Sequence, residues 1–202
     1  MKTHILLIIT LLSILVTACY KDNELKNSIF IYDPENRDLP AYSEWGYNTF
    51  GAYYDREIFV SNNKLVPAKV IVTATDFSFL LEGQKGASRY NSTLPDMGMS
   101  FTLSSFKATS YADLAQLNDS TINLLNPDCV VSVTIEEKKH SANIIEGKLI
   151  FNRVQILQVD KKQVEAILSG HFEFKAIIND KPITISDGRF DVGIGSDNFY
   201  RN

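Results

Sequence analysis

Alternation of apolar and polar side chains is the strongest pattern in the chain from Gly46 onward. In residues 148–154 and 171–176, apolar and polar side chains exchange places, as in an antiparallel strand with one face in a core and the other in water. Other runs rich in Val, Ile, Thr, Phe and Tyr are bounded by Gly, Asn, Asp and Pro, which favour turns. The segments predicted as strands are 49–54, 57–60, 66–75, 77–81, 97–106, 130–137, 144–154, 155–159, 164–178 and 182–192.

One segment has helical instead of alternating periodicity. Leucines recur at helical spacing in residues 111–125, where Ser110 followed by Asp113 forms an N-terminal capping pattern. We therefore predict one short α-helix near 111–125, lying across an opening of the sheet. Together these elements predict a single all-β domain over residues 46–202, an antiparallel β-sandwich or flattened β-barrel of roughly eight to ten strands.

The residues before this domain have the pattern of an export signal. An apolar run over residues 5–16 is shorter than the ~20 residues that span a bilayer, and small residues precede Cys19. Residues 16–19, Val-Thr-Ala-Cys, resemble the lipobox of bacterial lipoproteins. The resemblance implies that residues 1–18 are a signal peptide and that acyl chains on Cys19 bind the lipid bilayer. The polar residues 19–45 are then predicted to be a lipidated N-terminus and tether, with docking of residues 29–32 on the domain as an edge strand as the alternative.

The residues after the lipobox indicate a location. Lys21, Asp22 and Glu24 resemble the export signal of surface lipoproteins in the Bacteroidetes. The resemblance implies a lipid-anchored protein on the outer membrane that faces the cell exterior. Asn23 interrupts the acidic run, so the periplasmic face is the alternative location.

Composition narrows the possible partners. Removal of residues 1–18 leaves 202 − 18 = 184 residues, the size of one domain. Lys2 is the only charged residue removed, so the net charge becomes 19 − 24 = −5. With no basic cluster, nucleic acid is excluded as a partner. With Cys19 lipidated, Cys129 has no intramolecular disulfide partner and is interpreted as a small buried hydrophobic residue.

The candidates for catalysis and metal binding are weak. Neither His140 nor His171 has a second metal ligand at a recognisable spacing, and no serine lies in a nucleophile elbow. We therefore predict no catalytic residue, no cofactor and no enzymatic activity. Asp187, Asp191 and Asp197 have the oxygen ligands that Ca²⁺ prefers, but turn and bulge formation is the favoured interpretation. A glycosidase pair formed by Asp187 and Asp191 is a less favoured alternative.

Aromatic residues give a stronger indication of binding. The flat faces of Tyr and Trp stack on sugars or anchor partner proteins. The candidate binding residues are Tyr42, Trp45, Tyr47, Tyr53 and Tyr54. The alternative is that these residues fill the core or shield the edge of the first strand.

Two short motifs bracket the predicted domain. Residues 48–52, Asn-Thr-Phe-Gly-Ala, and residues 183–191, which end in Asp-Gly-Arg-Phe-Asp, resemble segments of Bacteroidetes lipoproteins of mostly unknown function. In those proteins an Asn-x-Phe-Gly segment opens an all-β domain and an Ile-Thr-x-Gly-Arg-Phe-Asp segment closes it. The resemblance implies no established activity and no catalytic residue. Residues 119–121 also resemble an O-glycosylation acceptor motif, with Ser120 as the attachment site.

These patterns predict a non-enzymatic surface lipoprotein that binds a glycan, a host protein or a partner in an uptake complex. The second prediction is a lipocalin-like barrel with a small apolar ligand inside it. A glycan-active enzyme is the third.

Overall fold

The computed structural model describes residues 28–61, 66–86, 94–159 and 162–202. Cys19, Lys21, Asp22 and Glu24, predicted to carry the lipid and the export signal, lie outside the described residues. The described part contains no helix that is both long and apolar enough to cross a membrane.

The chain is all-β with one short helix, as predicted. In chain order the elements are β1 (Thr49–Tyr54), β2 (Glu57–Val60), β3 (Ala68–Val72), β4 (Phe77–Gly86), β5 (Asp96–Leu103), the 3₁₀ helix η1 (Tyr111–Leu117), β6 (Ser120–Asn123), β7 (Cys129–Ile135), β8 (Lys138–Val159), β9 (Lys162–Ile178), β10 (Lys181–Gly195) and β11 (Phe199–Arg201).

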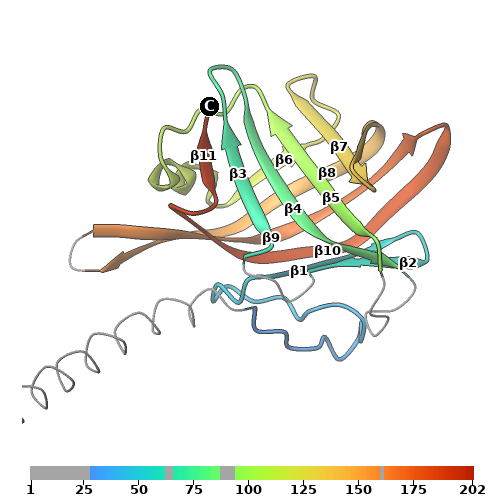
Figure 1. The fold of residues 1–202 in the computed structure, drawn as a ribbon, viewed down its shortest axis with the longest axis horizontal. Coiled ribbons are helices and arrows are strands. Elements are labelled where there is room, and N and C mark those ends of the chain that lie inside the picture. Colours follow the sequence, from blue (N-terminus) through green and yellow to red (C-terminus); the bar gives the residue numbers. More distant parts are fainter. Residues whose placement is uncertain (1–27, 62–65, 87–93, 160–161) are drawn as a thin grey trace, which may run out of the picture.

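Eight of these strands form a closed antiparallel barrel (Figure 1). Going round the barrel, the order is β4, β2, β1, β10, β9, β8, β7 and β5, and β5 pairs again with β4. Strand β3 pairs with a further stretch of β4, and β6 with a further stretch of β8. The sequence predicted either a β-sandwich or a flattened β-barrel, and the strand pairing shows that the fold is a barrel.

Hairpins connect β7 to β8 and β9 to β10, and β8 to β10 are the three longest strands. The turn before β8 has Glu136 and Glu137 at φ of 49° and 66°, and the turn before β10 has Asn179 and Asp180 at 52° and 61°. Two successive positive φ values are typical of the tight turn that matches strand twist. The predicted segments 144–154 and 155–159 both belong to β8, whose hairpin with β9 projects beyond the barrel (Figure 1).

Phenylalanine rings pack against one another inside the barrel. The Phe79 and Phe190 ring centroids are 5.2 Å apart, those of Phe151 and Phe190 are 5.5 Å apart, and those of Phe101 and Phe172 are 5.6 Å apart. All five rings are at most 1% exposed. Such contacts are typical of a packed core.

The helix is shorter than predicted. Residues 111–117 form η1, whose Leu114 and Leu117 are buried in the core. Asp119 then takes a φ of 55°, and the following residues pair with β8 as β6. The prediction of helix to residue 125 was wrong because the β-branched residues Thr121 and Ile122 join a sheet edge that no local pattern reveals.

Residues 28–47 lie against the outside of the barrel and are called the strap. Leu39 is fully buried there, against Ile58, Val60 and Tyr53 on the outward face of β1 and β2. The backbone N–H of Ile29 also donates to the carbonyl oxygen of Tyr47 at 2.8 Å. Residues 28–45 belong to the predicted tether, so this part is packed on the domain instead of free of it.

Candidate functional site

The strap is held by the carboxylate of Asp191 on β10, which is only 2% exposed. This carboxylate accepts hydrogen bonds from the backbone N–H groups of Trp45, Gly46 and Tyr47 at 3.2, 2.9 and 3.0 Å. The hydroxyl of Ser43 donates to it as well. From β9, the buried Ser169 hydroxyl donates to it at 2.9 Å. A buried charge with this many donors is stabilised, so Asp191 fixes the strap to the barrel.

A second contact fixes the strap ten residues earlier. Arg189, two residues before Asp191 and on the same face of β10, forms an ion pair with Asp33, and both side chains are largely buried. The Glu35 backbone N–H above all, with the Asn36 and Arg189 side chains, lowers the pKa of Asp33 from 3.8 to about 2. Asp33 is therefore ionised at neutral pH and holds this end of the strap.

The two motifs that bracket the domain lie side by side. Phe50 pairs with Phe190, and Gly51 pairs with Arg189. A Cβ at Gly51 would lie 2.4 Å from the Cδ of Pro40, so glycine lets the strap approach the sheet closely. Both motifs therefore serve the same contact between barrel and strap.

The structure separates the five candidate aromatic residues. Tyr54 lies in the barrel core at 6% exposed, and Tyr53 packs beneath the strap. Tyr47 and Tyr42 are half-buried, and Tyr42 stacks on His171 with ring centroids 4.3 Å apart. Trp45 is 76% exposed. The five residues therefore do not form one aromatic platform.

The Tyr42–His171 contact lies within a polar network on the outer face of β8 and β9. The Tyr42 hydroxyl donates to Glu44 at 2.9 Å, and Glu44 forms an ion pair with Arg153 at 3.2 Å. Burial above all, followed by Glu44, raises the pKa of Tyr42. His171 shares a hydrogen bond of 2.8 Å with Asn152. Burial, followed by the positive charge of Arg189, lowers the pKa of His171, so this ring is neutral at pH 7.

A groove begins beside His171 and runs along the outside of the barrel. It consists of two pockets of about 460 and 630 Å³, which meet at Lys148 and Glu173. The first lies between the strap turn and strands β8 to β10, and the second continues over β6 and β8 to β10. The groove is lined by Asp33, Glu35, Asn36, Thr121, Asn123, Glu146, Gly147, Lys148, Ile150, His171, Phe172, Glu173, Phe174, Lys175, Thr184, Ile185, Ser186, Asp187, Gly188 and Arg189.

Most charges in the groove have an opposite partner within it. Lys148 and Glu173 lie 3.1 Å apart across β8 and β9, and Lys175 and Glu146 lie 2.7 Å apart. These four side chains are about half exposed, so they remain accessible to a ligand. The groove therefore presents many hydrogen-bond donors and acceptors, and its five carboxylates exceed its three cationic side chains by two.

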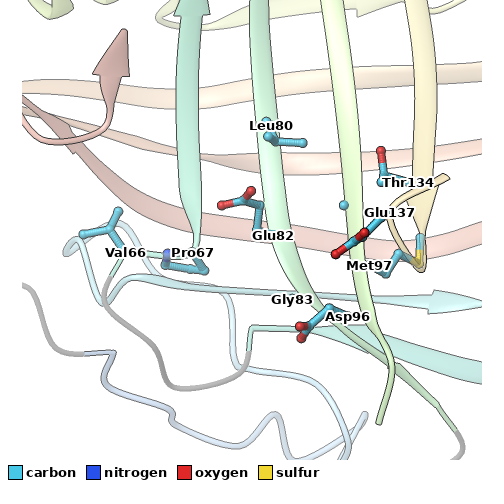
Figure 2. A pocket seen from close by; sticks show the side chains of 10 residues that line it. Val66, Pro67, Leu80, Glu82, Gly83, Asp96, Met97, Thr134 and Glu137 are labelled. Atoms are coloured by element: carbon cyan, nitrogen blue, oxygen red, sulfur yellow. The ribbon is translucent and has the colours of Figure 1, made fainter. Parts of the chain in front are cut away.

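A third pocket, of about 370 Å³, lies on the outer face of β4, β5 and β7 (Figure 2). Its lining includes the carboxylates of Glu82, Asp96 and Glu137, and Lys69 forms an ion pair of 2.6 Å with Glu82. Figure 2 shows that these carboxylates do not converge on one point. Across the described part of the chain, no three His, Cys, Asp or Glu side chains form a group able to hold a metal ion.

The other residues considered from the sequence as sites of metal binding, glycosylation or thiol chemistry make contacts within the fold. Asp187 lies at a bulge of β10 with a φ of 52°, whereas Asp191 binds the strap, so neither joins Asp197 in a Ca²⁺ site among the described residues. The Ser120 hydroxyl donates to the carbonyl oxygen of Leu117 at 2.6 Å. Cys129 is half-buried against the core, and burial raises its pKa to about 11.

No family model, curated protein or solved structure matches the chain.

Replacing Asp191 with Asn is expected to release the strap. The amide group of Asn turns a donor toward backbone N–H groups that need an acceptor, leaving buried donors unsatisfied. We expect amide-exchange protection at Gly46 and Tyr47 to fall about a hundredfold, equivalent to roughly 3 kcal/mol. Asp187→Asn is the matched control, because Arg189 contacts the backbone carbonyl of that residue and Asn tolerates its positive φ. Unchanged protection in Asp191→Asn would show that other contacts hold the strap.

Acid is expected to weaken the Asp33 contact. Because folding lowers the pKa of Asp33 from 3.8 to about 2, its contribution to stability is present above pH 4 and is lost as the pH falls toward 2. Urea unfolding of the wild type and of Asp33→Asn at pH 6, 4 and 2 measures this contribution. The wild type is expected to be more stable at pH 6, with the difference disappearing near pH 2. A difference that does not change with pH would contradict the assignment.

Proposed function

We propose that this protein is a lipid-anchored outer-membrane protein facing the cell exterior, and that its barrel binds a glycan without enzymatic turnover. The observation that carries the binding role is the groove, in which pockets of about 460 and 630 Å³ meet at the Lys148–Glu173 pair. Both volumes lie in the range of ligand sites, roughly 300–1,000 Å³.

The chemistry of the groove favours a polyhydroxylated ligand. Sugar hydroxyl groups both donate and accept hydrogen bonds, and the groove offers ammonium donors beside carboxylate acceptors, with the hydroxyl groups of Thr184 and Ser186 and the amide of Asn123 around them. A strongly charged ligand would be repelled by one member of each ion pair, because Lys148–Glu173 and Lys175–Glu146 each place both signs of charge in the groove. The side chains of Phe172, Phe174 and Ile185 in the lining are at most 2% exposed, so they offer little of the apolar centre that a protein partner generally buries.

An apolar ligand inside the barrel is the second candidate function. An eight-stranded barrel is compatible with such a role. Contacts between rings such as Phe79 and Phe190, whose centroids are 5.2 Å apart, occupy the interior and therefore favour a ligand on the outside.

The lipid anchor and the location are supported by the sequence. Val-Thr-Ala-Cys at residues 16–19 and the charged residues Lys21, Asp22 and Glu24 lie shortly before Ser28, whose hydroxyl donates to the carbonyl oxygen of Asn48 at 2.7 Å and so ties the chain to the domain 28 − 19 = 9 positions after Cys19. A short connection of this kind suits a domain held at a membrane surface.

Protease treatment of intact cells tests the anchor and the location. We expect the wild-type protein to be cleaved at the cell surface, because the proposed export signal would direct it to the cell exterior. Alanine at Lys21, Asp22 and Glu24 together is expected to protect it, and Cys19→Ala is expected to remove it from the membrane fraction. Cleavage of the wild type only after lysis would place the domain in the periplasm and contradict the proposed location.

A glycan array followed by calorimetry tests the groove. The double variant Lys148→Ala with Glu173→Ala is expected to weaken glycan binding at least about tenfold, roughly 1.4 kcal/mol, because it removes a donor and an acceptor from the point where the pockets meet. Glu82→Ala, in the pocket of Figure 2, is the control and should bind like the wild type. No glycan binding, or release of hydrolysed sugar, would contradict the proposed role.

A further inference from the structure

Exposed apolar side chains are concentrated on the strap. Of the ten large hydrophobic residues that are exposed in the described part of the chain, four belong to residues 28–47. Ile29, Ile31 and Tyr32 are 51, 50 and 47% exposed, and Trp45 is 76% exposed. These four side chains form the apolar strap surface. Asp191 and the buried Leu39 attach the strap to the barrel.

Backbone hydrogen bonds hold the two halves of this surface together. The N–H of Ile29 donates to the carbonyl oxygen of Tyr47 at 2.8 Å, and the N–H of Ala41 donates to that of Ile31 at 2.7 Å. Trp45 lies two residues before Tyr47. The stretches that carry the four exposed side chains therefore run beside each other on one side of the barrel (Figure 1).

The same surface is where the chain leaves the described domain toward Cys19. The hydroxyl of Ser28 donates to the carbonyl oxygen of Asn48 at 2.7 Å, which fixes the exit point next to Ile29. Only nine residue-to-residue steps, 28 − 19, separate Ser28 from Cys19. Even fully extended, such a segment reaches only ~30 Å. A lipid on Cys19 would therefore keep the strap within that distance of the bilayer.

We infer that the apolar strap surface contacts the membrane leaflet that holds the lipid anchor. The contact requires the anchor proposed for Cys19 and so rests on the proposed function. Trp and Tyr favour the interface between lipid and water, and Ile can insert among acyl chains. The strap has four carboxylates and one arginine, so attraction to anionic lipid does not drive the contact. Burial of apolar side chains drives the contact, so a membrane of zwitterionic lipid is sufficient for it.

Trp45 provides a direct probe because it is the only tryptophan in the chain. The full-length lipidated protein is reconstituted into phosphatidylcholine vesicles whose acyl chains are brominated close to the headgroups, and compared with protein in unbrominated vesicles. We expect bromine to quench Trp45 fluorescence at least about twofold, because an interfacial tryptophan lies at that depth. Ile31→Asp is expected to reduce the quenching, since it places a charge in the contact.

A matched control moves the probe to another part of the barrel. The double variant Trp45→Phe with Val130→Trp carries its tryptophan near the start of β7, at a site 51% exposed in the wild type and on the side away from the strap (Figure 1). Its fluorescence is expected to be the same in both vesicles. Equal quenching of both probes, or no quenching of Trp45 in protein that floats with the vesicles, overturns the inferred contact but leaves the anchor intact. Protein that does not float overturns the anchor and, with it, the contact.

Discussion

The arrangement of the outer surface depends on one buried carboxylate. Asp191 occupies an outward-facing position of β10, yet only 2% of it is exposed because the strap covers it. Burying a charge is costly unless its hydrogen-bonding capacity is filled, and here three backbone N–H groups and two hydroxyl groups fill it. The strap and Asp191 therefore stabilise each other, and the ion pair between Asp33 and Arg189 adds a second attachment.

The strap gives the barrel two different outer surfaces. Its turn at Asp33, Glu35 and Asn36 forms one end of the groove, which continues away from it over Lys148 and Glu173 to Lys175. Its other residues expose apolar side chains around the exit point of the chain. A domain with a packed interior can bind only on its outside, and the strap separates a polar surface suited to a soluble ligand from an apolar one suited to lipid.

Local patterns predicted the strands well and the long-range contacts poorly. Alternation and turn residues predicted the bounds of β1 and β2 to the residue. A strand with one buried face shows this in its own sequence, because apolar and polar residues alternate along it. The strap was missed because its partner, Asp191, lies more than 140 positions away from Gly46 and Tyr47. The groove was missed for a related reason: its polar side chains alternate with core residues, like any wet strand face, and only the pairing of β8, β9 and β10 brings them together.

The two sequence motifs, residues 48–52 and 183–191, act together to hold the strap on the barrel. In each, alternate residues serve opposite faces of the sheet: Phe50 and Phe190 pack inside the barrel, while Gly51, Arg189 and Asp191 meet the strap outside. Because β1 and β10 are neighbours in the barrel, the motifs act together even though most of the domain separates them in sequence. In this chain the two motifs together therefore fasten the segment before β1 to the last long strand. Lys148 and Glu173 lie outside both motifs, whereas residues 184–189 of the closing motif line the groove, so one segment contributes both to the strap contact and to one wall of the groove.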